Sequence, residues 1–429
     1  MTENENQTRP VRTLTVKNFS VIKEAELEFG KITVLIGPQS SGKSLLCKLA
    51  FFMGRVVLEI AMDQVVKLNE FSVFKDAVKR EFLRWFPQDG WGNWNWHLEF
   101  HAEQFSVSIS EFATSELTSE PELVFCEAFK SEYLKRVEES VEEKRQRGFL
   151  LTPALHSVAA TRFLRLAGRG VWDSATYIPL ERSFFVDMQK GYRVLAADAD
   201  PVSALFSIVF ADSMNSDVPK PRLKKFLKGE LVHRPDGLAV SFPDGRLLPI
   251  NFLSSGSKEV LPILSVLDLY EFRRRSSGSN WLSQELYGDK LYNFDELTIE
   301  EPEASIFPLT QYDLVREIAS LSNEKHFQSH FTITTHSPYI LTSFNNFIMA
   351  GQLAKEKPEL KDEITRLVPE HCWIEEDSFQ AYSIHDGVLK SILSKSGLID
   401  GEYLDSVSDT ISNEFDSLLR LEYDHTEAS

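Results

Sequence analysis

The chain has 429 residues, of which 42% are apolar and 26% are charged, as is typical of a globular protein with a sizeable core. Its formal net charge of −18 excludes a protein that coats DNA over its whole surface, because phosphate binding needs clustered lysine and arginine. The three cysteines are widely spaced and form no CxxC pair, which excludes a disulfide framework and a cysteine-rich zinc site. No apolar run reaches the ~18 residues of a membrane-spanning helix, and the polar N-terminus lacks a signal-peptide pattern. We therefore expect a cytoplasmic protein that makes no contact with a membrane.

Two stretches near the N-terminus, residues 11–16 and 25–29, alternate apolar and polar residues as half-buried strands do. The apolar run Ile32–Ile36 predicts a third, buried strand, and a helix is expected over residues 44–69. The octapeptide that joins strand and helix reads Gly37-Pro38-Gln39-Ser40-Ser41-Gly42-Lys43-Ser44. It has the G-x-x-x-x-G-K-S spacing of a phosphate-binding loop, in the strand–loop–helix context that this motif requires.

Each part of this octapeptide has a physical role in binding phosphate. The glycines let backbone N–H groups converge on phosphate oxygens, and the helix N-terminus adds a partial positive charge. Lys43 would reach the β- and γ-phosphates, and the Ser44 hydroxyl would be a ligand of Mg²⁺. The sequence therefore predicts a site for a nucleoside triphosphate, with ATP and Mg²⁺ as the expected ligands.

The segment 70–105 is unusually rich in aromatic residues. Its tryptophans are Trp85, Trp91, Trp94 and Trp96. They form either a partner-binding face or the core of a small insertion, and burial is the commoner fate of such clusters. Residues 125–147 predict a charged helix.

Further along the chain, the pattern predicts strands and helices in alternation. Strands are expected at 176–179, 238–242, 247–250, near Leu297 and at 331–335, and helices over most of 187–228, at 258–275, at 309–322 and from 398 onward. A basic cluster within residues 220–228 contains Lys220, Arg222, Lys224, Lys225 and Lys228. This cluster, or Arg273-Arg274-Arg275, could contact DNA locally, although such runs are more often solvated helix faces.

Three segments after residue 250 carry candidate chemistry. Ser254 and Gly256 lie in a turn at the start of an apolar helix, which is a second anion-binding helix N-terminus. Glu300 and Glu301 end an apolar strand, so one carboxylate could hold Mg²⁺ through water and the other could polarise an attacking water. His336 ends the next buried strand, where it could sense a γ-phosphate. Asp295-Glu296 also follows apolar residues and is a rival carboxylate pair.

The order of these segments resembles the head of ABC-type ATPases, and most closely the branch that contains SMC, RecF and OLD-type proteins. The opening TLTVKNFSVIKEAELEFGKITVLIGPQSSGKS carries the same resemblance, which covers residues 12–50 and 249–350. It implies an α/β fold: a P-loop NTPase head with a mixed core sheet and N-terminal antiparallel strands, a helical signature lobe and a small insertion. The implied units are 1–60 and 291–350 for the ATPase core, 61–175 for an aromatic-rich helical insertion, 176–290 for the signature lobe and 351–429 for a helical C-terminal extension.

The resemblance also implies roles for single residues. Ser254 and Gly256 would contact the γ-phosphate of a nucleotide held by another subunit. Glu301 would be the catalytic glutamate, Glu300 the carboxylate on the Mg²⁺ side and His336 the switch histidine. The following Pro302-Glu303 matches the family and favours Glu300-Glu301 over Asp295-Glu296.

Four positions depart from the family pattern. Glu300 stands where Asp is usual, Ser255 and Ser257 replace Gly and Gln of the signature, and Gln39 replaces Asn. The longer carboxylate at position 300 bears on the rate of hydrolysis more than on nucleotide binding.

Some OLD-type proteins carry a C-terminal TOPRIM nuclease, but the residues after Ser337-Pro338 lack the spaced carboxylates that two-metal chemistry requires. The segments YIPLERS and FNNFIMAGQLAK resemble the stand-alone ATPase subunits of bacterial anti-phage systems, of which PARIS is the nearest example. YIPLERS contains Glu181-Arg182, and its arginine either faces the nucleotide or forms a structural salt bridge.

This resemblance implies an ATP-dependent sensor or scaffold in anti-phage defence. It implies a homo-oligomer with at least two heads and a separate effector, for which a TOPRIM-type nuclease is the candidate. Two alternatives remain: a RecF-like DNA-repair clamp, and a nucleotide-gated scaffold that does not hydrolyse ATP.

Overall fold

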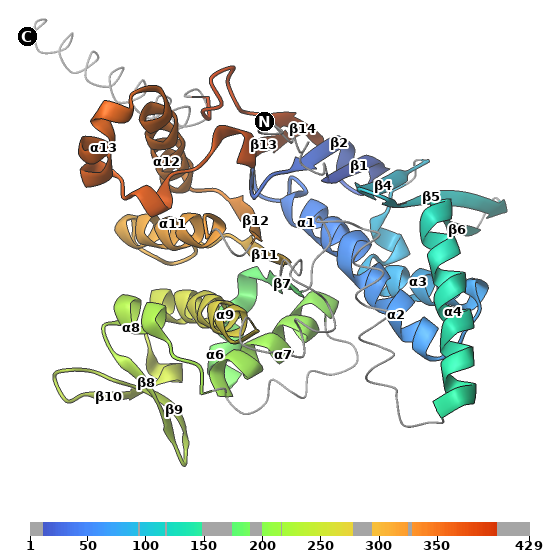
Figure 1. Ribbon diagram of the computed structural model, residues 1–429, viewed down its shortest axis with the longest axis horizontal. Helices are drawn as coiled ribbons and strands as arrows, with labels where there is room; N and C mark the ends of the chain where they lie inside the picture. The colour runs from blue at the N-terminus through green and yellow to red at the C-terminus, as the bar shows by residue number, and fades with distance from the viewer. Residues whose placement is uncertain are drawn as a thin grey trace, which may run out of the picture.

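The computed structural model describes residues 12–92, 95–115, 118–147, 174–188, 200–215, 217–277, 294–324 and 328–400. Its framework is an eleven-stranded mixed sheet in the order β6-β5-β4-β1-β2-β14-β13-β3-β12-β11-β7. Helices cover this sheet, so the α/β class expected from the sequence is confirmed (Figure 1).

The centre of the sheet is parallel and buried. β3 (Ile32–Ile36) lies between β12 (Gln328–Thr335) and β13 (Phe379–His385), and β11 (Phe294–Glu300) lies between β12 and β7 (Ser174–Ile178). The strand predictions at 32–36, near Leu297 and at 331–335 are confirmed. Because these strands are parallel, their carboxyl ends meet at one edge of the sheet, where ligands bind in open α/β folds.

The C-terminal part of the described chain differs from the expected helical extension. β13 and β14 (Val388–Ser391) form a hairpin that fills the sheet between β3 and β2. Four consecutive residues of β13, Ala381 to Ile384, are buried, because both faces of this strand are covered. Residues 401–429, which include most of the expected acidic helix, lie outside the described residues.

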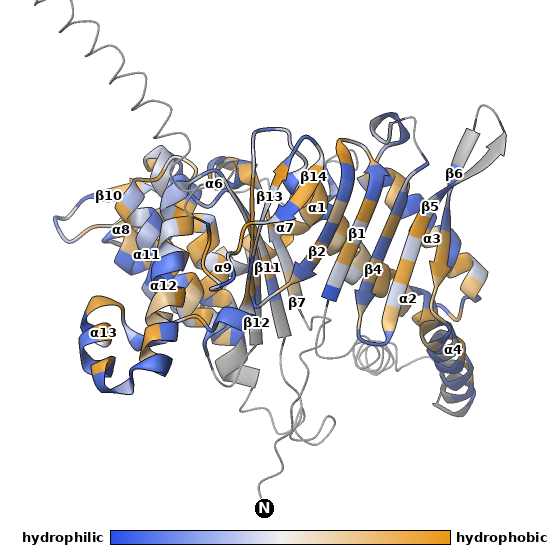
Figure 2. Ribbon diagram, turned by 90° about the horizontal axis from the view of Figure 1, so that it is seen from above, coloured by the Kyte–Doolittle hydropathy of each residue, from blue (hydrophilic) through white to orange (hydrophobic). Residues whose placement is uncertain are grey.

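The N-terminal strands are antiparallel. β1 (Arg12–Phe19) pairs with β2 (Ile22–Phe29) and also with β4 (His97–Ala102), which continues through β5 (Phe105–Ser115) to β6 (Thr118–Phe125). Hydrophobic and hydrophilic residues alternate along β1 and β2, as expected for strands with one buried face (Figure 2). The segment expected as a separate helical insertion is therefore partly an extension of the main sheet.

The helix after the phosphate-binding loop leads into the helices that pack on these antiparallel strands. α1 (Lys43–Phe51) continues through a π-helical turn, Phe52–Val56, into α2 (Val57–Val66), and α3 (Phe71–Trp85) and α4 (Glu127–Arg147) follow. Trp85, Trp91 and Trp96 are buried in one cluster with Phe19, Phe52 and Phe82, so burial is the fate of these aromatic residues. Trp94 lies outside the described residues.

A second lobe is built from four helices and a small sheet. It comprises α6 (Ser183–Met188), α7 (Pro201–Asn215), α8 (Pro221–Leu227), α9 (Ser255–Ser277) and the strands β8 (Glu230–Arg234), β9 (Gly237–Ser241) and β10 (Leu247–Pro249). The strands expected at 238–242 and 247–250 are present as β9 and β10, which pair antiparallel, and β8 adds a third strand. This lobe lies on the opposite side of the molecule from α4 (Figure 1).

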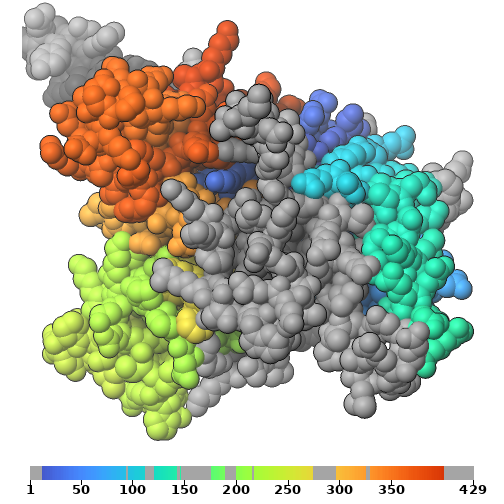
Figure 3. Space-filling model, in the orientation of Figure 1, coloured from blue at the N-terminus to red at the C-terminus, as the bar shows by residue number. Residues whose placement is uncertain are grey.

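The remaining helices, α11 (Pro308–Ser322), α12 (Pro338–Glu356) and α13 (Lys361–Leu367), form a body beside the second lobe. In Figure 3 this orange body and the yellow-green lobe are neighbours on the molecular surface. The helix predicted at 309–322 is confirmed as α11. None of the helices within the described residues is long and apolar enough to cross a membrane.

Candidate functional site

The phosphate-binding loop lies between β3 and α1, at the carboxyl edge of the parallel strands. Gly42 has a φ of 107°, a conformation that L side chains rarely adopt, and it caps the N-terminus of α1. A Cβ on Gly37 would overlap the carbonyl oxygen of Ile384 in β13. Gly42 is therefore required by its own backbone conformation, and Gly37 by the close approach of β13, a strand far away in the sequence.

Lys43 lies inside this loop with its side chain almost fully buried. Its ammonium donates to the carbonyl oxygens of Gly37 at 2.8 Å and Pro38 at 2.9 Å. Burial lowers the pKa of Lys43, and the nearby Glu301 carboxylate opposes this change by favouring the charged form. The loop thus holds a cation pointed into its own concavity.

The loop also contains a polar atom without a partner. The buried Ser41 hydroxyl makes no hydrogen bond within the described structure, and it would lie 3.0 Å from a Cβ on Gly37. A buried hydroxyl is costly unless it is hydrogen-bonded. A phosphate oxygen in the loop would satisfy it, so the residues present fit a triphosphate.

Glu301 and His336 meet across the ends of β11 and β12. The Glu301 carboxylate lies 3.1 Å from Nε2 of His336, and both side chains are partly exposed. Glu301 has a φ of 40°, which is unusual for a residue other than glycine, and its N–H donates to the Thr334 carbonyl at 2.9 Å. The two predicted catalytic residues are therefore in contact and face open space.

Glu300, the preceding residue, is buried and held by two donors. Its carboxylate accepts from the Tyr177 hydroxyl at 2.7 Å and from the Leu180 N–H at 3.1 Å. The same hydroxyl lies 3.4 Å from the carbonyl of Ser44. Tyr177 thus connects the two residues predicted to ligate Mg²⁺, a link with no local signal in the sequence because it joins separate strands.

Glu303 is a functional candidate that the sequence interpretation did not assign. Its carboxylate accepts from the Thr335 hydroxyl at 2.8 Å and from the His336 N–H at 2.6 Å, while its second oxygen is buried without a hydrogen bond. Burial raises the pKa of Glu303. Glu303 therefore fixes the backbone of His336, and its place two residues after Glu301 was the available signal.

The rival carboxylate Glu296 lies within β11, away from Glu301 and His336. It is buried and paired with Arg12 at 3.1 Å, and it also accepts from the Thr332 hydroxyl at 3.2 Å. Burial raises the pKa of Glu296, and the Arg12 guanidinium opposes this by stabilising the charged form. Neither Glu296 nor Arg12 lines the pocket described below. Nothing is described of the Asp295 side chain.

A pocket of about 420 Å³ joins the phosphate-binding loop to Glu301 and His336, and Glu300 and Glu303 do not line it. Its lining includes the loop residues Gln39 to Ser44 together with Glu301 and His336. An apolar wall completes it, made of Phe19, Val21, Trp85, Phe86, Pro87 and Trp91. The sequence did not indicate that part of the aromatic segment would border the phosphate loop.

The predicted signature residues lie outside this pocket. Ser254 is exposed and caps α9, accepting from the Ser257 N–H at 3.3 Å. A Cβ on Gly256 would lie 2.7 Å from the carbonyl oxygen of Ser305, so the signature turn packs closely on the loop after Glu303. Neither Ser254 nor Gly256 lines the pocket that holds its own chain's Lys43.

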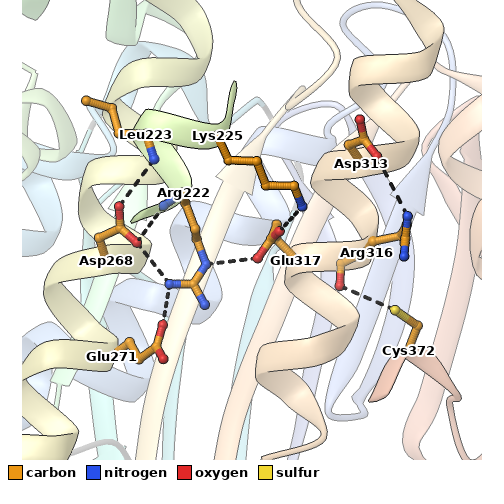
Figure 4. A network of polar contacts seen from close by, with 9 residues as sticks. All are labelled: Arg222, Leu223, Lys225, Asp268, Glu271, Asp313, Arg316, Glu317 and Cys372. Carbon is orange, nitrogen blue, oxygen red and sulfur yellow. Dashed lines mark hydrogen bonds and ion pairs between the residues drawn. The ribbon is translucent and has the colours of Figure 1, made fainter. Parts of the chain in front are cut away.

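The basic cluster at 220–228 is largely paired with carboxylates (Figure 4). Arg222 contacts Asp268 at 3.0 Å, Glu317 at 3.1 Å and also Glu271. Lys225 lies 2.7 Å from Glu317, and Lys224 pairs with Glu230. These pairs join α8 to α9 and α11, which favours a structural role over DNA contact. In the second basic run, Arg273 pairs with Asp212, and nothing is described of the side chains of Arg274 and Arg275.

Part of the chain is similar to a known family of domains. Residues 177–341 match the family of AAA ATPase domains. The match begins in β7 and ends in α12, so it includes the signature turn, Glu300, Glu301 and His336, while the phosphate-binding loop precedes it. The matched segment is less than half of the chain.

Two solved structures align with most of the chain. The SMC head domain from Thermotoga maritima is 13% identical, with 90% of this chain and 99% of that chain covered and a TM-score of 0.38. The ADP conformation of MJ1267, an ATP-binding cassette of an ABC transporter, is 12% identical, with 93% and 95% covered and a TM-score of 0.32. No curated protein has a detectably related sequence. Because both TM-scores are low, the P-loop fold rests on the chain's own strand order and phosphate loop.

Proposed function

We propose that the protein is an ABC-type ATPase that binds and hydrolyses ATP with Mg²⁺. The observation that carries this proposal is the contact between Glu301 and His336 at the pocket that Lys43 enters. Lys43 would neutralise charge on the β- and γ-phosphates. Glu301 would accept a proton from the attacking water, and His336 would orient that water and the γ-phosphate. The proximity of Lys43 and Glu301 keeps these roles within one site.

The donor set for Mg²⁺ consists of oxygen atoms, as this ion prefers. The Ser44 hydroxyl and the Glu300 carboxylate would hold the ion, in part through water. When bound, Mg²⁺ would neutralise phosphate charge during transfer of the γ-phosphoryl group. Tyr177 and Leu180 fix the Glu300 carboxylate, and this support offsets the extra flexibility of glutamate at a position where the family has aspartate.

The active assembly in this proposal contains two heads. Ser254 and Gly256 do not line their own pocket, so they would complete the nucleotide site of a second copy. Phe252, beside the signature turn, is 69% exposed, and Phe307, after the Glu303 loop, is 74% exposed. Large exposed aromatic side chains flanking a functional turn are common at protein interfaces. A second head would cover them.

Ser254→Arg tests this assembly. We expect ATP affinity to stay within about twofold of wild type, while turnover falls by about a hundredfold or more because a bulky cation blocks the second head. Equilibrium ATP binding, phosphate release and light scattering with ATP would measure these effects. Ser72→Arg, which places the same side chain on an exposed position of α3, is the matched control. A strict monomer at full activity in the presence of ATP would contradict the two-headed site.

We further propose that this ATPase is a sensor and scaffold of anti-phage defence that holds and releases a separate effector, with a TOPRIM-type nuclease as the candidate. ATP would act as a state selector, because a ligand shifts a conformational equilibrium only by its differential affinity for the two states. The charge of −18 suits a surface that docks protein more than one that binds DNA. The paired basic cluster at 220–228 also favours this role over that of a RecF-like DNA clamp.

A phage challenge of cells that carry the native operon tests the biological role. Lys43→Ala is expected to abolish protection, because weaker ATP binding depletes the nucleotide-dependent state. Lys67→Ala, which removes an exposed lysine paired with Asp63 at the end of α2, should protect as wild type does. Full protection by the Lys43→Ala operon, or by this protein without any neighbouring gene, would exclude the sensor-scaffold role. Undetectable turnover with intact ATP binding would instead favour the non-hydrolysing scaffold.

A further inference from the structure

Arg182 is a completely buried cation with an unusual set of partners. It follows β7 and donates to the carbonyl oxygens of Glu300 at 2.6 Å, Glu301 at 2.9 Å and Pro179 at 3.2 Å. Its Nε donates to the carbonyl oxygen of Glu259 at 3.0 Å and lies 3.3 Å from that residue's carboxylate. It does not line the nucleotide pocket, and its carboxylate partner is Glu259 and not the neighbouring Glu181.

Two of these hydrogen bonds act on the strand end that carries the catalytic carboxylate. Glu301 adopts a left-handed backbone conformation, which persists only where surrounding groups hold it. Thr334 binds its N–H, and Arg182 binds its carbonyl oxygen. The direction of the Glu301 side chain toward His336 therefore depends on Arg182.

The other partner of Arg182 belongs to the signature helix. Glu259 lies in the first turns of α9, whose N-terminus presents Ser254 and Gly256. The Glu259 side chain is only 12% exposed, and the carboxylate oxygen that lies 3.3 Å from Nε of Arg182 makes no hydrogen bond. Its contact with the guanidinium is therefore an ion pair, while the hydrogen bond from Nε goes to the Glu259 carbonyl oxygen. Burial lowers the pKa of Arg182, and the Glu259 carboxylate counteracts this by favouring the cation. One planar guanidinium thus connects the signature helix α9 to the backbone carbonyl oxygens of Glu300 and Glu301.

We propose that Arg182 is a positioning residue that couples the signature helix to the catalytic glutamate of the same chain. The proposal rests on the proposed two-headed ATPase. When the signature turn of one head engages the nucleotide of the second, any shift of α9 reaches Glu301 of the first head through Glu259 and Arg182. Occupation of one composite site then prepares the other, and turnover is cooperative in ATP.

Glu259→Gln and Arg182→Lys test this coupling in the full chain. Both variants retain Lys43, so the equilibrium affinity for ATP should stay within about twofold of wild type. We expect kcat to fall by about tenfold and the Hill coefficient of turnover to fall from above 1 toward 1. Lysine cannot present the forked donors of arginine to two carbonyl oxygens, and glutamine lacks the charge that holds the guanidinium.

Glu296→Gln is the matched control. It removes the carboxylate from a different buried ion pair, Glu296 with Arg12. Glu296 lies on β11, the strand that ends in Glu300, and neither partner lines the pocket. Its melting temperature should fall, but kcat and the Hill coefficient should match wild type. A purely structural role for Arg182 would instead make the three variants alike once their folded fractions are equal, and this result would overturn the coupling.

The wild-type measurements separate this proposal from the one on which it rests. Turnover with a Hill coefficient of 1 would overturn the coupling and leave the ATPase function standing. Absence of turnover would overturn both. If Arg182→Lys does not fold, Glu259→Gln decides: wild-type kcat and cooperativity in that variant would exclude the coupling.

Discussion

Lys43→Ala is expected to weaken ATP binding by roughly 10- to 100-fold, because loss of charge-assisted hydrogen bonds costs about 1.5–3 kcal/mol. The ammonium is the cation that the phosphate loop directs into its own concavity, held by the Gly37 and Pro38 carbonyls. Alanine removes the positive charge and leaves these carbonyl groups facing the phosphates, so electrostatic repulsion adds to the lost attraction. Titration calorimetry with ATP and Mg²⁺ would measure the change.

The control for this experiment is Lys67→Ala, which removes one lysine of the same charge at an exposed position outside the pocket. It should bind ATP as wild type does, since salt screens the interaction between an exposed charge outside the pocket and the bound phosphates. ATP binding by Lys43→Ala at wild-type affinity would show that the octapeptide is not the nucleotide site.

Glu301→Gln has the second large expected effect, on the rate and not on binding. ATP affinity should be retained, while kcat falls by roughly 10²- to 10⁴-fold, because an amide cannot accept the proton of the attacking water. Single-turnover phosphate release and equilibrium ATP binding would separate the two steps. A retained complex with slow turnover would also make this variant suitable for isolating the two-headed state.

Glu296→Gln is the comparison that distinguishes the two carboxylate assignments. We expect normal kcat but a loss of stability of about 3–5 kcal/mol, because the buried Arg12 guanidinium loses its charged partner. Thermal unfolding would measure this loss. The assignment of Glu301 would be wrong if Glu301→Gln hydrolysed ATP at the wild-type rate while Glu296→Gln did not.

The sequence by itself determined the features that depend on near neighbours in the chain. The alternation of residues before Ile32 predicted β1 and β2, and the octapeptide Gly37 to Ser44 predicted the loop between a strand and a helix. Period-2 and period-3.6 patterns also located β11, β12 and α11, because burial of one face sets the spacing of apolar residues. The order of Glu300, Glu301 and His336 along the chain was enough to name them as candidates.

Only the tertiary structure decided which of these candidates meet. Glu296 and Glu301 both lie at or near the end of an apolar run, yet only Glu301 reaches His336 at the nucleotide pocket, because β11 points its carboxyl end toward the phosphate loop and its other end toward Arg12. Arg222 likewise pairs with carboxylates that are distant in sequence, Asp268 of α9 and Glu317 of α11.

The largest differences from the sequence predictions arise for the same reason. β13 lies beside β3 although more than 340 residues separate them. The carbonyl oxygen of Ile384 in β13 leaves no room for a side chain at the loop residue Gly37. Arg182 is close in sequence to Pro179 alone among the residues that it binds, while Glu259, Glu300 and Glu301 lie on other elements. Hydrogen bonds and ion pairs across a sheet leave no periodic pattern in the chain, so they are fixed only when the strands and helices pack.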